Sequence, residues 1–237
     1  MSTRVSLQSS DLKMSKQRLR NINDLVEAGL IESASPKFRE IEQHYDIGVS
    51  DHVRSLMTNA QHDPIAQQYI PSEKELNIRP DEEADPIGDD VYSPVAGIVH
   101  RYPDRVLLKA TNVCAVYCRY CFRKEMIGAN SQHLSVDQLG NALSYISTHP
   151  EIWEVILTGG DPLVLSARRL QYIFDALEDM DHVRMVRVHT RIPVADPSKI
   201  DNTILSVLKG FSKSIQIVIH VNLSLIHISE PTRPSQI

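Results

Sequence analysis

All three cysteines of the 237-residue chain lie within eight consecutive residues, as Cys114, Cys118 and Cys121. An odd, clustered set of thiols is a poor basis for disulfides, whereas thiolates are soft ligands that suit iron–sulfur clusters and zinc. An iron–sulfur cubane is normally held by four cysteines. Three cysteines would therefore leave one iron open to a small-molecule ligand, as the open position does in catalytic metal sites.

Two other interpretations of the cysteines stay open at this point. The first is a structural zinc site with a histidine as the fourth ligand. The second is an inert buried set. Positions i, i+4 and i+7 fall on one face of a helix, and a buried cysteine behaves as a small hydrophobic residue.

A short turn, Gly159-Gly160-Asp161-Pro162, follows an apolar segment and offers a different chemistry. Glycines permit close approach of the backbone to a ligand, and a carboxylate accepts hydrogen bonds from an ammonium group. By itself, this four-residue segment predicts only a turn. Its interpretation depends on where the fold places it relative to the cysteines.

The elements that would position these groups alternate between apolar strands and amphipathic helices. The strand candidates lie at 105–111, 153–158, 183–189 and 214–221. One helical pattern begins near Ser135, one begins near Ser166 and one covers 198–211. This alternation predicts an α/β fold with a parallel sheet covered by helices, either doubly wound or a barrel. The cysteines and the glycine turn both follow strands, so we expect them at the edge where such folds place their chemistry.

The first 94 residues show no comparable motif. Helical patterns occur at 16–31, 35–45 and 50–60. Ser35 is suited to cap the second of them, and Ser50 or Asp51 is suited to cap the third. Residues 71–94 are rich in acidic residues and proline, which predicts an extended connector.

Composition excludes several classes of protein. The formal net charge of −5 argues against a general nucleic-acid binder. No apolar run approaches the roughly 20 residues needed to span a bilayer, and the N-terminus lacks the apolar region of a signal peptide. The sequence therefore predicts a cytoplasmic protein whose partners include neither nucleic acid nor a membrane.

The C-terminal segment 223–233, LSLIHISEPTR, is similar to the translation of a sequencing-library adapter. We therefore predict that the last genuine residue lies near Asn222 and that the chain is a truncated gene product. The alternative is a genuine strand and turn.

Taken together, the motifs resemble those of a known family. A Cys-x3-Cys-x2-Cys segment after the first strand of a β/α series resembles the signature of the radical S-adenosylmethionine (SAM) superfamily. The longer string HRYPDRVLLKATNVCAVYCRYCFRKEMIG is similar to lysine 2,3-aminomutase and its relatives, as are LTGGDPLVLS, HTRIPVADP and IVIHVN. The resemblance covers roughly residues 60–222.

This resemblance implies a partial TIM-type (β/α) barrel over residues 95–222, preceded by a helical region and connector over 1–94 and followed by a non-native tail over 223–237. It implies that the three cysteines bind a [4Fe–4S] cluster whose open iron chelates SAM. Tyr120 matches the position beside the adenine, and Gly159, Gly160 and Asp161 match the motif that receives the SAM amino group. Reductive cleavage of SAM would then give a 5′-deoxyadenosyl radical.

The resemblance also implies pyridoxal 5′-phosphate (PLP), which in the family forms an aldimine with the substrate during migration of an amino group. Arg101, Tyr102 and Arg105 match the family segment that contacts PLP, and Asp85 matches an acid near that cofactor. Arg123 matches the arginine that holds the substrate carboxylate. The implied reaction converts L-lysine to β-lysine. The implied partners are an electron donor such as flavodoxin or ferredoxin and, for the full-length protein, further copies of itself.

One departure limits what the chain itself can do. In the family, the lysine that carries PLP and the acids that hold the ε-ammonium group lie beyond the end of this chain, and no lysine in 1–222 matches the former. We therefore assign no catalytic residue and expect an incomplete enzyme. Two alternatives remain, a relative that modifies lysine for elongation factor P and a non-catalytic module that binds zinc or an iron–sulfur cluster.

Overall fold

The computed structural model describes residues 18–58, 63–127 and 132–222, and the tail after Asn222 lies outside them. Its centre is a sheet of five strands in the order β1-β2-β3-β4-β5. The strands are β1 (Ile98–Tyr102), β2 (Arg105–Thr111), β3 (Glu154–Gly159), β4 (Met185–Thr190) and β5 (Ser214–Ile219). β1 runs antiparallel to β2, and the other pairs are parallel. The predicted α/β fold is confirmed, with an open sheet that fits a partial barrel.

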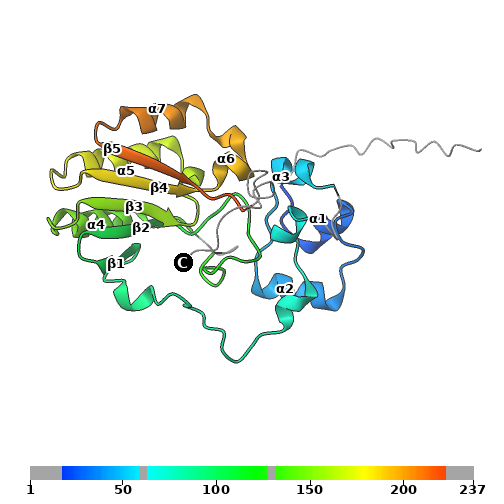
Figure 1. Ribbon diagram of the computed structural model, residues 1–237. Coiled ribbons are helices and arrows are strands. Elements are labelled where there is room, and N and C mark those ends of the chain that lie inside the picture. Colours follow the sequence, from blue (N-terminus) through cyan, green and yellow to red (C-terminus); the bar gives the residue numbers. More distant parts are fainter. Residues whose placement is uncertain (1–17, 59–62, 128–131, 223–237) are drawn as a thin grey trace, which may run out of the picture.

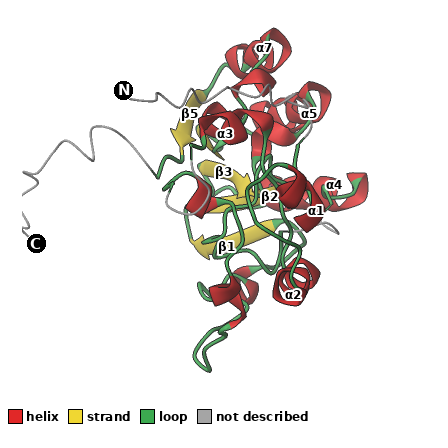
Figure 2. Ribbon diagram, turned by 90° about the vertical axis from the view of Figure 1, so that its right-hand side faces the viewer, coloured by secondary structure: helices red, strands yellow, loops and turns green. Residues whose placement is uncertain are grey.

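Three helices connect the parallel strands, α4 (Val136–Ser147), α5 (Ala167–Glu178) and α7 (Asn202–Gly210). They lie on the same side of the sheet (Figure 2). Ser135, Ser166 and Asp201 cap their N-termini by accepting a hydrogen bond from a backbone N–H group, as such residues commonly do. Short helical turns fill the connections, namely η4 (Pro162–Val164), α6 (Ile192–Ala195) and η5 (Pro197–Lys199).

The two faces of the sheet differ in polarity. Val106, Val155 and Val186 are in register and buried. Because successive side chains alternate between faces, the residues beside them lie on the other face, where Glu154 forms ion pairs with Arg105 and Arg187. The helices therefore cover an apolar face, and the opposite face carries charged groups.

The N-terminal region forms three short helices, α1 (Ile22–Glu27), α2 (Pro36–His44) and α3 (Asp51–Leu56). Ser35 caps the second helix, as predicted, and Ser50 rather than Asp51 caps the third. Ile22 and Leu25 of α1 and Val53 of α3 belong to the same hydrophobic cluster as the core of the sheet. Figure 1 shows the three helices beyond one end of the sheet, with the green segment that follows β2 between.

Several predicted boundaries need correction. The helix expected at 16–31 is limited to α1 among the described residues, and β1 has no counterpart in the sequence prediction. The connector contains two 3-10 turns, η2 (Glu73–Leu76) and η3 (Asp90–Tyr92), and a third, η1 (Ala66–Gln68), precedes it. Within the described residues, none of the helices combines the length and the apolar character needed to cross a bilayer.

Candidate functional site

The cysteine segment and the glycine turn meet at the C-terminal edge of the sheet. Thr111, the last residue of β2, pairs with Gly159, the last residue of β3. The Gly160 N–H group donates to the Thr111 carbonyl at 2.7 Å, and the Asp161 N–H group donates to the Val113 carbonyl at 2.9 Å. The backbone of the turn therefore holds the start of the cysteine segment, as the positions after the strands led us to expect.

This close approach requires glycine at both positions. Gly159 has a φ of +100°, a conformation that L side chains rarely adopt. A Cβ atom on Gly160 would lie 2.7 Å from the Val113 nitrogen and closer still to the Val113 carbonyl oxygen. Because the obstructing atoms belong to the backbone, no rotation of a side chain relieves the clash.

The three cysteines line one small cavity of about 50 Å³, together with residues that include Asp46, Tyr117 and Lys124. The segment forms turns, so the interpretation of the spacing as one face of a helix is wrong. Burial raises the pKa of the Cys114 and Cys118 thiols. A metal that binds them must therefore displace protons.

The cysteines are near one another without converging on one point. Among the described residues, no three His, Cys, Asp or Glu side chains are arranged to hold a single metal ion. In a cubane each cysteine binds a different iron, so thiols spread around a cavity fit that donor set better than they fit one tetrahedral ion.

Residues of the N-terminal region hold the cysteine segment from the other side. The N–H group of Tyr117 donates to the Gly48 carbonyl at 2.9 Å, and that of Arg119 donates to the Gln68 carbonyl at 2.8 Å. The Arg119 guanidinium pairs with Glu75 through two of its nitrogens. The sequence analysis missed this role, because nothing local to the helical region points to a partner so distant along the chain.

We expect the substitution Glu75→Gln to lower the free energy of unfolding by about 2 kcal/mol, because hydrogen bonds to charged groups contribute about 1.5–3 kcal/mol. The side chains of Arg119 and Glu75 are only 9% and 15% exposed. Urea denaturation followed by circular dichroism measures the change. The neighbouring Glu73 pairs with Lys37 in an exposed site, so Glu73→Gln is the matched control and should leave the midpoint unchanged. Equal effects of the two substitutions would contradict the prediction.

Asp161 is buried and its carboxylate is fully occupied within the chain. Oδ1 accepts from the Leu163 N–H group and the Thr190 hydroxyl. Oδ2 accepts from the N–H groups of Arg191 and Ile192. A carboxylate offers about four acceptor positions, and these bonds use them, so the contact with an ammonium group that the motif implies stays a prediction. Burial raises the pKa of Asp161, while these four bonds favour its charged form.

Arg191, which the sequence analysis did not single out, lies beside the cysteines. Its guanidinium donates to the Tyr69 hydroxyl at 3.0 Å, to Gln68 Oε1 at 2.6 Å and to the Cys118 sulfur at 3.4 Å. It also donates to the hydroxyl of Tyr120, which is 43% exposed. One feature of the sequence could have indicated Arg191. It follows the strand β4 directly, and the cysteine segment and the glycine turn lie at the same edge of the sheet.

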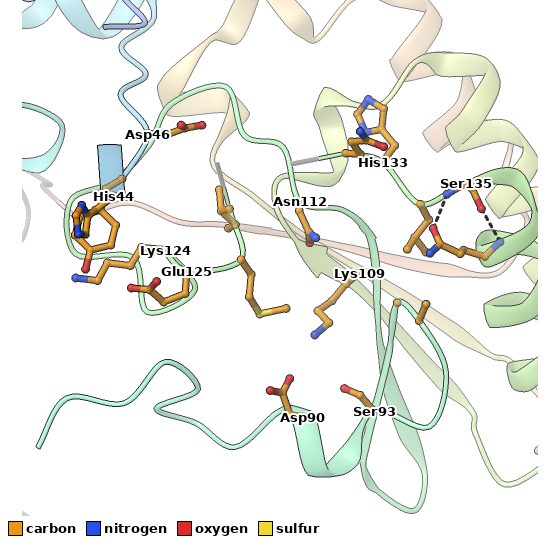
Figure 3. Close-up of a pocket in the computed structure, with 18 of the residues that line it drawn as sticks. His44, Asp46, Asp90, Ser93, Lys109, Asn112, Lys124, Glu125, His133 and Ser135 are labelled. Carbon is orange, nitrogen blue, oxygen red and sulfur yellow. Dashed lines mark hydrogen bonds between the residues drawn. The ribbon is translucent and has the colours of Figure 1, made fainter. Parts of the chain in front are cut away.

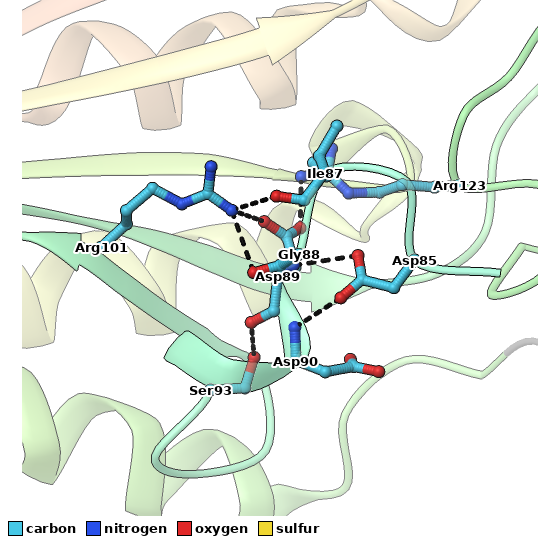
Figure 4. Close-up of polar contacts among 8 residues, drawn as sticks. All are labelled: Asp85, Ile87, Gly88, Asp89, Asp90, Ser93, Arg101 and Arg123. Atoms are coloured by element: carbon cyan, nitrogen blue, oxygen red, sulfur yellow. Dashed lines mark hydrogen bonds and ion pairs between the residues drawn. The ribbon is translucent and has the colours of Figure 1, made fainter. Parts of the chain in front are cut away.

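Three of the candidate PLP and substrate residues, Asp85, Arg101 and Arg123, lie around Asp89 (Figure 4). Arg123 donates to the Asp89 carboxylate at 2.8 Å, and Arg101 lies 3.7 Å from it. Asp85 accepts from the backbone N–H groups of Asp89 and Asp90. The Nε atom of Arg123 is buried and has no hydrogen-bond partner in the described part of the chain. Asp89, missed in the sequence, is therefore the residue that gathers Arg101 and Arg123.

Tyr102 and Arg105 are not brought to the cysteines. Tyr102 is 60% exposed at the end of β1. Arg105 begins β2 and pairs with Asp104 and Glu154. At about 3.3 Å per residue, β2 separates Arg105 from the cysteine segment by roughly 20 Å. Their assignment to PLP stays a prediction.

A larger cavity of about 890 Å³ adjoins the one lined by the cysteines, and both are lined by Asp46 and Lys124. Lys109 points into it from β2, and Asp90 and Ser93 lie opposite (Figure 3). Lys109 is 7% exposed, and burial lowers its pKa. The volume is within the range of small-molecule sites.

Comparison with known proteins agrees with this arrangement. Residues 108–233 match the family described as the Radical SAM superfamily. The chain is 39% identical over 153 residues to the L-lysine 2,3-aminomutase of Clostridium subterminale, covering 65% of this chain and 37% of that protein. It is 36% identical over 202 residues to the enzyme of Methanococcus maripaludis, covering 83% and 46%. The Bacillus subtilis enzyme is 32% identical over 209 residues, with coverage of 87% and 44%. The chain thus spans less than half the length of these relatives.

Proposed function

The chain belongs to the radical SAM superfamily, and from this premise we propose that it forms the cluster- and SAM-binding part of an isomerase of the L-lysine 2,3-aminomutase type. Its relatives carry that name at 32–39% identity. The proposed substrate is L-lysine and the proposed product is β-lysine. A one-electron donor such as flavodoxin or ferredoxin is the proposed partner.

The observation that carries the proposal is the shared cavity of Cys114, Cys118 and Cys121 beside the glycine turn. Three thiols around a cavity suit a [4Fe–4S] cluster with one iron left open. When bound, this cluster and SAM supply one-electron cleavage of SAM and a carbon radical that abstracts hydrogen. The chain contributes the thiolates, and its N-terminal region and glycine turn hold them in position.

We assign SAM to the space beside the Gly159–Gly160 turn. The turn is hydrogen-bonded to the start of the cysteine segment, so SAM bound to the open iron would lie next to it. The half-exposed ring of Tyr120 offers a flat surface for the adenine. Asp161 belongs to the proposed SAM site by its motif, and its carboxylate also holds the backbone after β4.

The substrate and PLP are assigned to the polar groups around Asp89. The buried Nε atom of Arg123, which has no hydrogen-bond partner among the described residues, suits a substrate carboxylate. Arg101 supplies a guanidinium for a phosphate, and Asp85 orders the backbone beside it. When bound, PLP supplies the conjugated system through which an amino group can migrate. The assignment of PLP also draws on the named relatives.

Anaerobic reconstitution with iron and sulfide tests the proposal. We expect a brown protein whose reduced form gives an EPR signal that changes when SAM is added. The formation of 5′-deoxyadenosine in the presence of a reductant is the second readout. A colourless protein with one bound zinc would support the binding-module alternative and contradict the proposal.

A further inference from the structure

Arg191 places a buried positive charge at the edge of the sheet, and no carboxylate in the described part of the chain forms an ion pair with it. The residue is 8% exposed. Within the described ranges its guanidinium forms no ion pair with Asp or Glu. Its hydrogen-bond acceptors there are neutral oxygens and the Cys118 sulfur, and it also lies over the rings of Tyr69 and Tyr120. A buried charge is costly unless an opposite charge compensates it. The site therefore favours a negative group next to the guanidinium.

The position of the guanidinium is fixed from two sides. Asp161 accepts hydrogen bonds from the backbone N–H groups of Arg191 and Ile192, which ties this segment to the glycine turn. At the other end, Tyr69 and Gln68 accept from two different nitrogens of the guanidinium. The short distance to the cysteine is therefore a feature of the packed structure, because the side chain is held along its whole length.

The group that this charge faces is the Cys118 sulfur, 3.4 Å from Nη1. We propose that Arg191 is the charge partner of a cluster bound through Cys118 and that its positive charge makes this cluster easier to reduce. This inference rests on the proposed function. The reduction potential of an iron–sulfur cluster depends on its net charge, on hydrogen bonds to sulfur and on exposure to solvent. An added electron increases the negative charge, so a nearby cation stabilises the reduced form more than the oxidised form.

The test is an EPR-monitored redox titration of the reconstituted 237-residue chain without SAM. We expect Arg191→Gln to disfavour reduction of the cluster at least tenfold, which is a shift of 59 mV to more negative potential for a one-electron couple. Arg191→Lys keeps the charge and should give a midpoint nearer to that of the unchanged protein. Arg168 is exposed on α5, so Arg168→Gln removes the same charge from the surface and should leave the midpoint unchanged.

Iron and sulfide contents are measured first, so that two kinds of failure can be told apart. If the unchanged protein binds no cluster, the proposed function fails. If it binds a cluster and Arg191→Gln has the same midpoint, only the role of Arg191 is overturned, even where the affinity for SAM falls. If Arg191→Gln takes up no iron while Arg191→Lys does, a positive charge is required beside the cluster, which supports the proposal. Loss of iron from both variants would show a purely structural role and overturn it.

Discussion

Replacement of Cys114, Cys118 or Cys121 by alanine is expected to abolish incorporation of the iron–sulfur cluster. The three thiols line one cavity, and no other cysteine exists in the chain to substitute for a lost ligand. A cubane is normally held by four cysteines. With two thiolates left, two of its irons would have no protein ligand. Iron and sulfide analysis after anaerobic reconstitution, together with the absorption of the brown chromophore, measures the result.

A matched control comes from the same segment. Phe122 is 50% exposed and follows Cys121 directly, so Phe122→Ala changes the segment without removing a thiol and should leave the iron content unchanged. Near-normal iron and sulfide in any of the three cysteine variants would show that the residue is not a ligand. A stoichiometry of one zinc in the unchanged protein would point to the structural zinc alternative.

The second large effect is expected at the glycine turn. Gly160→Ala should lower the free energy of unfolding by about 3 kcal/mol, the upper end of the usual cost of overpacking, because the new Cβ atom would meet the Val113 backbone at 2.7 Å. At about 2–4 °C per kcal/mol for a chain of this size, the melting temperature should fall by roughly 6–12 °C. Differential scanning calorimetry of the cluster-free protein measures both quantities.

Gly140 gives the control for this substitution. It lies inside α4, and a Cβ atom there would have nothing within 4 Å. Because alanine is favoured over glycine in helices by about 1 kcal/mol, Gly140→Ala should raise the melting temperature. An unchanged melting temperature for Gly160→Ala would mean that the cysteine segment can move away from the turn. The close contact between Gly160 and Val113 would then not be needed for stability.

Much of the fold could be predicted because its signals are local. The strands are short, apolar segments. Each connecting helix begins after an N-cap residue, such as Ser135 or Ser166. The meeting of the cysteines and the glycine turn also followed from sequence, since both come directly after parallel strands. The strand β1 was not predicted from the sequence, because His100 and Arg101 interrupt its apolar character.

The partners of the site residues could not be predicted, because they are separated by long stretches of chain. Arg191 and the Cys118 sulfur it contacts are 73 residues apart, and Arg119 and Glu75 are 44 apart. Nothing in a local pattern says which buried arginine will lie against which thiol. The partners of Asp161 within the chain were missed for the same reason. Its motif suggests contact with a ligand, whereas three of its four hydrogen-bond donors belong to Thr190, the last residue of β4, and to Arg191 and Ile192 after it.

The hold of the N-terminal region on the cysteine segment has a consequence for synthesis. During translation, Gly48 and Gln68 leave the ribosome before Tyr117 and Arg119, the residues they will bind. One side of the cysteine cavity can therefore form as soon as the third cysteine emerges, while Arg191 is still tens of residues from being made. A nascent chain would thus expose its thiols on one flank until β4 is complete, which sets the earliest point at which an enclosed cluster can be assembled.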